Sequence, residues 1–170
     1  MPTSQKAAVP AFEVEIVHED GEWSHLVGLD ALIDTAAGTA VRHIQGSKAS
    51  GFVSVALSSD AHVSDLNGKF RGKPKPTNVL SFPAGAGTPG NHIGDIILAL
   101  ETVKREAADQ SIPVEHHVQH LVVHGVLHLL GYDHDTASDA EQMEAIEISI
   151  LSKLGIANPY TGDLETGTRD

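Results

Sequence analysis

The sequence HLVVHGVLHLLGYDH, residues 120–134, places three histidines in the spacing H-x3-H-x5-H. On an α-helix, His124 and His128 lie about one turn apart on the same face, so both imidazoles can point at one atom. Gly131 can end this helix, because glycine readily adopts the left-handed conformation found at helix ends. The turn that follows can bring His134 back to the same point. The spacing therefore predicts a metal site on a central helix and the turn after it.

Three protein ligands would leave a fourth position open to water, which is typical of catalytic rather than structural zinc. A hydrogen-bonded cluster of histidines is the alternative interpretation. Zinc peptidases with the H-E-x-x-H motif use the glutamate beside the first histidine as general base, but this chain has Gly125 there. Groups that move protons or stabilise charge must therefore come from outside this helix. His120 lies one turn earlier, where the helix face has rotated by about 80° from His128, which favours a supporting role over ligation.

The composition is typical of a soluble, globular domain and limits the residues that could bind a metal. The chain has 170 residues, 41% hydrophobic residues and no cysteine, so a transition metal must bind histidine or carboxylate. No run reaches the roughly 18 apolar residues of a membrane span, and residues 1–10 lack the apolar centre of a signal peptide. We therefore expect a cytoplasmic protein that contacts no membrane.

The charge is strongly acidic overall but has one basic cluster. The formal net charge of −12 argues against loose binding of nucleic acid over the whole surface. However, 4 of the 11 lysines and arginines fall within one short segment: Lys69, Arg71, Lys73 and Lys75. By itself, a cluster of this size is more typical of a solvated loop than of a binding surface.

Alternating and helical periodicities predict an α/β fold of the α+β type. Strands are expected over 12–16, 52–57, 79–82 and 92–99, and helices over 23–43, 59–66, 101–110, from 114 towards Gly131, and from 138 towards Gly155. The linker between the third and fourth strands is too short for a helical crossover, so this pair should be antiparallel. We expect a small mixed sheet of about four strands covered by helices.

Local signals set the expected boundaries. Ser59 should cap the second helix and Gly68 should end it, which leaves Lys69 to Asn78 as a basic loop. Ser138 should cap the last helix. We expect a disordered lead over 1–10, a single metallo-hydrolase domain over 11–156 and a polar tail over 157–170.

Several motifs, taken in order along the chain, resemble one known family. They are Phe70-Arg71, the segment TNVLSFP over 77–83, Gly94-Asp95-Ile96 and the histidine stretch over 120–134. Over about residues 52–154 the chain is similar to the bacterial YbeY family of metal-dependent endoribonucleases. The first 50 residues match only in general layout.

The resemblance implies a single-strand-specific endoribonuclease that matures ribosomal RNA, notably the 3′ end of the small-subunit RNA, and takes part in ribosome quality control. It implies one zinc ion per chain, held by His124, His128 and His134, with Arg71 facing the metal. Single-stranded RNA and the ribosome are the implied partners. The basic cluster then becomes a candidate substrate groove.

The expected roles follow from phosphodiester chemistry. Arg71 and His124 are the candidate catalytic residues, because a guanidinium opposite the metal can clamp the phosphate oxygens as they gain charge. Arg71, Lys73 and Lys75 are the candidate substrate-binding residues.

His120, Asp133 and Asp95 are candidates for orienting the ligands from behind. Asp95 could instead simply cap the end of a strand. Two other functions stay open: a metal-dependent hydrolase of another phosphoester, and a ribosome-associated factor whose zinc is mainly structural.

Overall fold

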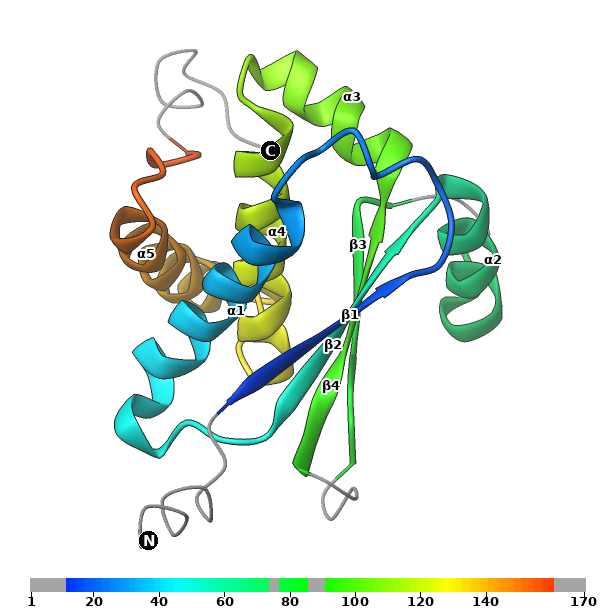
Figure 1. The fold of residues 1–170 in the computed structure, drawn as a ribbon. Helices are drawn as coiled ribbons and strands as arrows, with labels where there is room; N and C mark the ends of the chain where they lie inside the picture. Colours follow the sequence, from blue (N-terminus) through cyan, green and yellow to red (C-terminus); the bar gives the residue numbers. More distant parts are fainter. Residues whose placement is uncertain (1–11, 74–76, 86–90, 161–170) are drawn as a thin grey trace, which may run out of the picture.

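The computed structural model describes residues 12–73, 77–85 and 91–160 (Figure 1). In chain order, the elements are β1 (Glu13–His18), α1 (Leu29–Gln45), the 3-10 helix η2 (Gly46–Lys48), β2 (Phe52–Ser58), α2 (Asp60–Arg71), β3 (Val79–Pro83), β4 (His92–Ala99), α3 (Leu100–Gln110), α4 (Val114–Leu129) and α5 (Ala137–Lys153). Within these described ranges, no helix has both the length and the apolar character that a membrane crossing requires.

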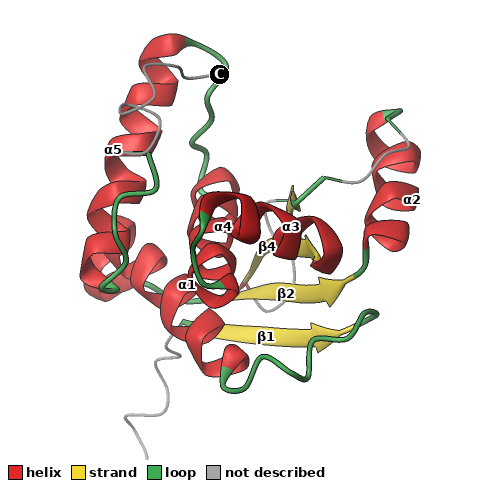
Figure 2. Ribbon diagram, turned by 90° about the horizontal axis from the view of Figure 1, so that it is seen from above, coloured by secondary structure: helices red, strands yellow, loops and turns green. Residues whose placement is uncertain are grey.

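The four strands form one mixed sheet in the order β1-β2-β4-β3. β1, β2 and β4 run parallel, whereas β3 pairs antiparallel with β4, with Val79 opposite Leu98. The predicted mixed sheet and its antiparallel pair are therefore confirmed. In Figure 1, α1, α4 and α5 lie on one side of the sheet and α2 lies on the other, and Figure 2 again shows α5 and α2 at opposite sides.

The main core lies between the sheet and the helices α1 and α4. Alternate residues of β2 and β4, among them Val55 and Ile96, are fully buried against this side, together with Val122 and Val126 of α4. A second, smaller cluster lies on the opposite face, where Val63 of α2 packs on the sheet. The helix with the histidines is thus the central, buried helix, as its apolar pattern predicts.

Two glycines bring α4 close to the sheet. A side chain at Gly94 would come within 2.5 Å of Leu129 Cδ2 and 2.7 Å of the Phe82 carbonyl oxygen. A side chain at Gly125 would come within 3.0 Å of Ile96 Cδ1. The position that carries glutamate in zinc peptidases therefore faces the sheet in this chain and has no room for one.

Two helix boundaries differ from the expectation. α1 begins at Leu29 rather than Trp23, because Gly28 has a φ of 78° and Trp23 donates from Nε1 to the Asp20 and Ser58 carbonyl oxygens at 3.0 and 3.1 Å. α2 does not end at Gly68: it continues for one more turn, to Arg71.

The longer α2 changes the setting of the basic cluster. The left-handed Gly72 (φ 70°) ends the helix, so Arg71 occupies its last turn rather than a loop. Lys69 lies in the same turn, whereas Lys73 follows the cap. Lys75 lies outside the described residues.

The start of α5 also differs from the expectation. Thr136, not Ser138, caps this helix, and its hydroxyl accepts a hydrogen bond from the Asp139 backbone N–H at 3.0 Å. The expected lead over 1–10 lies outside the described residues. Of the expected tail, only 157–160 is described, and Tyr160 returns to the region of α4 and α5.

Candidate metal centre

The end of α4 and the turn after it bring three imidazoles together. Gly131 adopts a φ of 103° and donates its N–H to the His128 carbonyl oxygen at 3.0 Å, which closes the last turn. The chain then reverses, and the ring of His134 stacks on that of His124 with 5.6 Å between centroids. One ligand atom from each of His124, His128 and His134 lies within 4.8 Å of the other two. This three-histidine group could hold a metal ion.

A buried carboxylate fixes the orientation of His124. Glu147 of α5 is fully buried, and its Oε2 meets His124 Nδ1 in a short hydrogen bond. An ionised carboxylate can only accept, so Nδ1 carries the proton and Nε2 presents its lone pair. A metal-binding histidine that donates its other N–H to a carboxylate is a recurrent arrangement, because it sets both the tautomer and the ring orientation.

The spacing of two of the three ligand nitrogens fits a tetrahedral ion. His124 Nε2 and His128 Nε2 are 3.1 Å apart. Two imidazole ligands at the usual zinc–nitrogen distance, about 2.0–2.1 Å, would lie about 3.3 Å from each other around a tetrahedral centre. Burial lowers the pKa of His128, and the neighbouring His124 and His134 lower it further, which favours the neutral, ligating form.

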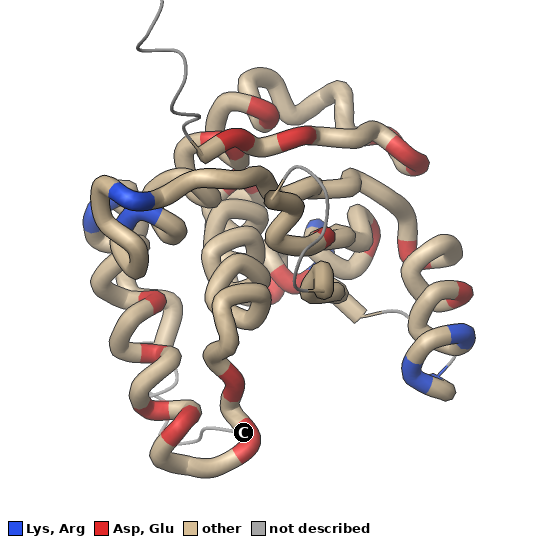
Figure 3. The backbone as a smooth tube through the Cα atoms, turned by 90° about the horizontal axis from the view of Figure 1, so that it is seen from below, with Lys and Arg blue, Asp and Glu red and all other residues tan. Residues whose placement is uncertain are grey.

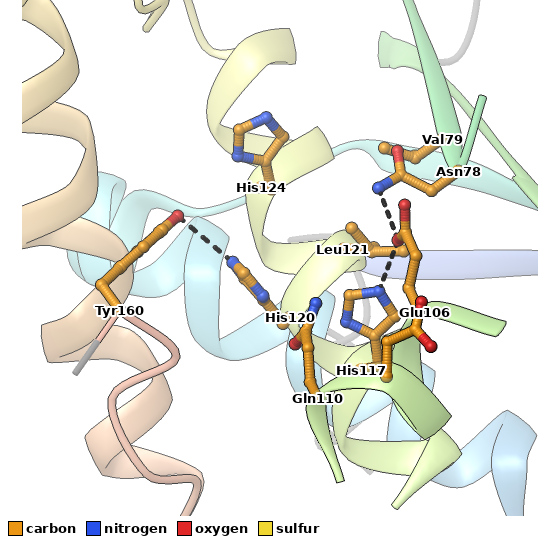
Figure 4. Close-up of a pocket in the computed structure, with 10 residues that line it drawn as sticks. Asn78, Val79, Glu106, Gln110, His117, His120, Leu121, His124 and Tyr160 are labelled. Atoms are coloured by element: carbon orange, nitrogen blue, oxygen red, sulfur yellow. Dashed lines mark hydrogen bonds and ion pairs between the residues drawn. The ribbon is translucent and has the colours of Figure 1, made fainter. Parts of the chain in front are cut away.

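The carboxylate of Glu147 is the centre of a larger hydrogen-bond network. Tyr160 donates its hydroxyl to Glu147 Oε1, and His120 Nε2 lies 3.6 Å from the same oxygen. Burial alone would raise the pKa of Glu147, but the hydrogen bonds from His120 and His124 outweigh it and lower the pKa to about 2. His120 therefore contacts the group that orients His124 and is not part of the three-histidine group. Figure 4 shows the ring of His120 directed at the Tyr160 hydroxyl.

A cleft of about 670 Å³ joins the histidines to the basic cluster. Its lining includes all three histidines together with Arg71, Lys73, Asn78 and Asp135. Arg71 donates from Nη2 to the Ser81 carbonyl oxygen at 3.0 Å, and its guanidinium carbon lies 5.4 Å from the centroid of the Phe82 ring. The acidic positions are widely scattered, and one of the few basic groups lies at the end of α2 (Figure 3).

The site is assembled across an edge strand. β3 is the last strand of the sheet, α4 lies on one face and α2 on the other. Arg71 is held by the backbone and an aromatic ring of β3, whereas the histidines come from α4 and its turn. The structure therefore brings the predicted arginine and the predicted ligands into one cleft, although the helices that carry them, α2 and α4, lie on opposite faces of the sheet.

Two of the predicted orienting residues lie elsewhere. Asp133 accepts a hydrogen bond from the Asp135 backbone N–H at 3.3 Å, so it stabilises the turn after α4. Asp95 alternates along β4 with Gly94 and Ile96, which face α4, so its side chain points to the opposite face. There it lies 3.2 Å from His92. The structure does not bring Asp95 to the histidines.

Glu147 is the principal residue that the sequence analysis missed. It lies four residues after Met143 and three before Ile150, on the stripe of α5 that packs into the core. An acidic residue in an apolar stripe is rarely buried without a partner. That signal is present in the sequence and indicates a buried carboxylate with a polar partner, which the structure identifies as His124.

Comparison with known proteins identifies relatives over most of the chain. The family profile described as Endoribonuclease YbeY matches residues 22–155. The chain is 45% identical over 154 residues to an Endoribonuclease YbeY of Rhodopseudomonas palustris, covering 87% of this chain and 80% of that protein. It is also 45% identical over 160 residues to an Endoribonuclease YbeY of a Chelativorans strain, covering 91% of this chain and 97% of that protein.

A solved structure supports the fold as well. The solution structure of a protein from Thermotoga maritima superposes with a TM-score of 0.58 at 26% identity, covering 91% of this chain and 93% of that one. The profile match takes in α1 to α5, and with them the three histidines, Arg71 and Glu147. The chain therefore belongs to the YbeY family of endoribonucleases.

Proposed function

We propose that this chain is a zinc-dependent endoribonuclease specific for single-stranded RNA. His124, His128 and His134 hold one zinc ion, and Arg71 faces it across the cleft. Its role is the maturation of ribosomal RNA, notably at the 3′ end of the small-subunit RNA, and ribosome quality control in the cytoplasm. The observation that carries the proposal is the single cleft lined by three convergent imidazoles and a guanidinium.

When bound, zinc supplies a Lewis acid and lowers the pKa of a coordinated water to about 7. The chain's own residues do the rest. Glu147 holds the Nδ1 proton of His124, which keeps Nε2 available. Arg71, anchored on Ser81, offers its remaining N–H groups to phosphate oxygens that gain charge during cleavage. Lys73 lines the same cleft, where it can contact a flanking phosphate.

The arrangement favours a catalytic over a structural metal. Among the described residues, the convergent group contains three ligands, and a structural zinc site usually has four. The fourth position is then available to water or substrate. The alternative function, hydrolysis of another phosphoester, has no specific observation in its favour. The basic residues line an open cleft, which suits a polymer, rather than a closed pocket for a small molecule.

Cleavage of single- and double-stranded RNA by purified protein tests the proposal. His128→Ala should abolish cleavage of single-stranded RNA, and Arg71→Ala should lower kcat by about 10²–10³-fold, as for the loss of one transition-state donor. The matched controls are His25→Ala and Lys48→Ala, which change exposed residues outside the cleft and the basic cluster and should behave like the parent.

Arg71→Ala protein that cleaves as fast as the parent would rule out the charge clamp. Chelation followed by add-back of zinc, with the metal content and the melting temperature measured at each step, separates a catalytic from a structural ion. Mapping of small-subunit RNA 3′ ends in cells that express only His128→Ala tests the proposed substrate: mature ends there would contradict it.

A further inference from the structure

A second pocket lies beside the metal cleft. It has a volume of about 340 Å³, within the range of small-ligand pockets. It shares Asn78, Val79 and His124 with the cleft, so the two hollows meet along a common wall. Figure 4 shows Glu106 and His117 on one side of this pocket, and His120 and Tyr160 on the other.

The polar side of the pocket is held in place by hydrogen bonds. Glu106 Oε1 accepts from Asn78 Nδ2 at 2.9 Å and from His117 Nε2 at 2.8 Å. His117 is only 3% exposed, and its Nδ1 has no hydrogen-bond partner within the described ranges. The Glu106 hydrogen bond therefore fixes the ring of His117 in the wall of the pocket.

Two carboxylates of α3 face this pocket. Glu106 and Asp109 are three residues apart on the helix, hence on neighbouring turns of one face, and both line the pocket. Among the described contacts, Glu106 Oε2 and the Asp109 carboxylate accept no hydrogen bond, so both can accept one from a ligand. Gln110 adds an exposed amide to the same wall.

The charge of the pocket selects the kind of ligand. A phosphate would be repelled by Glu106 and Asp109 and attracted instead by Arg71 and Lys73 in the adjoining cleft. A tightly bound metal ion is disfavoured too, because the three histidines are the only group of three or more potential ligands that converges within 4.8 Å among the described residues. A neutral group that is rich in hydrogen-bond donors suits these carboxylates, and the adjoining cleft can hold a phosphate attached to it.

An unpaired guanine has these properties. Its Watson–Crick edge presents a ring N–H next to an exocyclic amino group, two adjacent donors that suit two carboxylate acceptors. The opposite side of the pocket is lined by the rings of His120 and Tyr160, which lie edge to face at 5.8 Å and supply aromatic surface to a bound base. Leu121 adds an apolar surface.

We propose that this pocket binds the base of an unpaired guanosine next to the scissile phosphate, with Glu106 and Asp109 accepting from its Watson–Crick edge. The inference rests on the proposed ribonuclease function and adds a specificity determinant to it. It also gives a physical reason for a preference for single strands, because the edge that is recognised is hidden in a duplex.

The test uses two oligouridylates of equal length. One carries a single guanosine, and the other carries inosine there, which keeps the ring N–H but lacks the amino group. The zinc-loaded parent should bind the guanosine oligonucleotide, by fluorescence anisotropy, about tenfold more tightly than the inosine one, and should show a similar ratio in kcat/KM. Glu106→Gln should reduce both ratios to near one.

The controls separate recognition from folding. Glu141→Gln removes the same charge from an exposed position on α5 and should keep the parent's ratio. If Glu106→Gln does not fold, the exposed Asp109→Asn takes its place and should lower the ratio by at least threefold.

The possible outcomes test the guanine pocket and the proposed ribonuclease activity separately. Equal binding and cleavage of the two oligonucleotides by an active parent would overturn the guanine pocket and leave the nuclease intact. A guanosine preference in binding without any cleavage would support the pocket and overturn the nuclease. Loss of the preference in Glu141→Gln as well as in Glu106→Gln would show that net charge, rather than the pocket, decides.

Discussion

Replacement of Glu147 by glutamine is the most informative single change in this molecule. The substitution keeps the shape of a fully buried side chain and its ability to accept from His124 Nδ1–H, but it removes the negative charge. It leaves the three proposed metal ligands untouched. Any effect on the metal must therefore pass through the orientation and basicity of His124.

The size of the effect follows from the carboxylate's pKa. Glu147 has its pKa lowered from the ordinary value of 4.5 to about 2, which corresponds to about 3 kcal/mol of stability at neutral pH. Glutamine keeps a neutral hydrogen bond worth about 1 kcal/mol. We therefore expect Glu147→Gln to lower the free energy of unfolding of the metal-free protein by about 2 kcal/mol. Loss of a supporting carboxylate should weaken zinc binding by about 10–100-fold.

Urea denaturation of the metal-free proteins and zinc competition with a chelating dye measure the two quantities separately. Glu141→Gln, exposed on the same helix, is the control for loss of one charge. A change of less than about 0.5 kcal/mol, together with a zinc affinity within threefold of the parent, would refute the reasoning. It would mean that the buried carboxylate neither stabilises the fold nor orients the ligand.

Three other changes test separate parts of the structure. Folding lowers the pKa of Glu147, so its contribution to the free energy of unfolding is complete above the unfolded pKa of 4.5 and is lost as the pH falls through about 2. In unfolding experiments on the metal-free proteins, the parent should therefore lose about 3 kcal/mol more over this pH range than Glu147→Gln. Gly94→Ala places a methyl group 2.5 Å from a leucine carbon and 2.7 Å from a backbone oxygen, so it should cost about 1–3 kcal/mol in urea, whereas Gly85→Ala, with nothing within 4 Å, should cost almost nothing. Thr136→Ala should lower the stability by about 1 kcal/mol through loss of the cap of α5, and Ser138→Ala should change it by less than half of that; equal effects would contradict the observed cap.

Short-range patterns predicted the fold and the histidine cluster well. The three histidines lie within eleven residues, so helix periodicity and one glycine turn were sufficient to bring them together. The antiparallel β3–β4 pair followed from the length of its linker. These features depend on local geometry, which a sequence displays directly.

The residues that were misplaced depend on tertiary contacts. Gly68 reads as a helix end, yet α2 continues past it to Gly72, so the position of Arg71 could not be derived from glycine spacing alone. Asp95 was grouped with the site because of its motif, but strand alternation places it on the other face. Glu147 comes from a different helix, and only the packing of α5 on α4 brings it to His124.

The way Arg71 is anchored makes one half of the cleft depend on an edge strand. The three histidines lie on one helix and the turn after it, whereas the guanidinium is held by Ser81 and Phe82 of β3. Because β3 pairs with β4 at the edge of the sheet, loss of that pairing would release the arginine and leave the histidines in place. Local helix geometry therefore maintains one half of the cleft, and long-range strand pairing maintains the other.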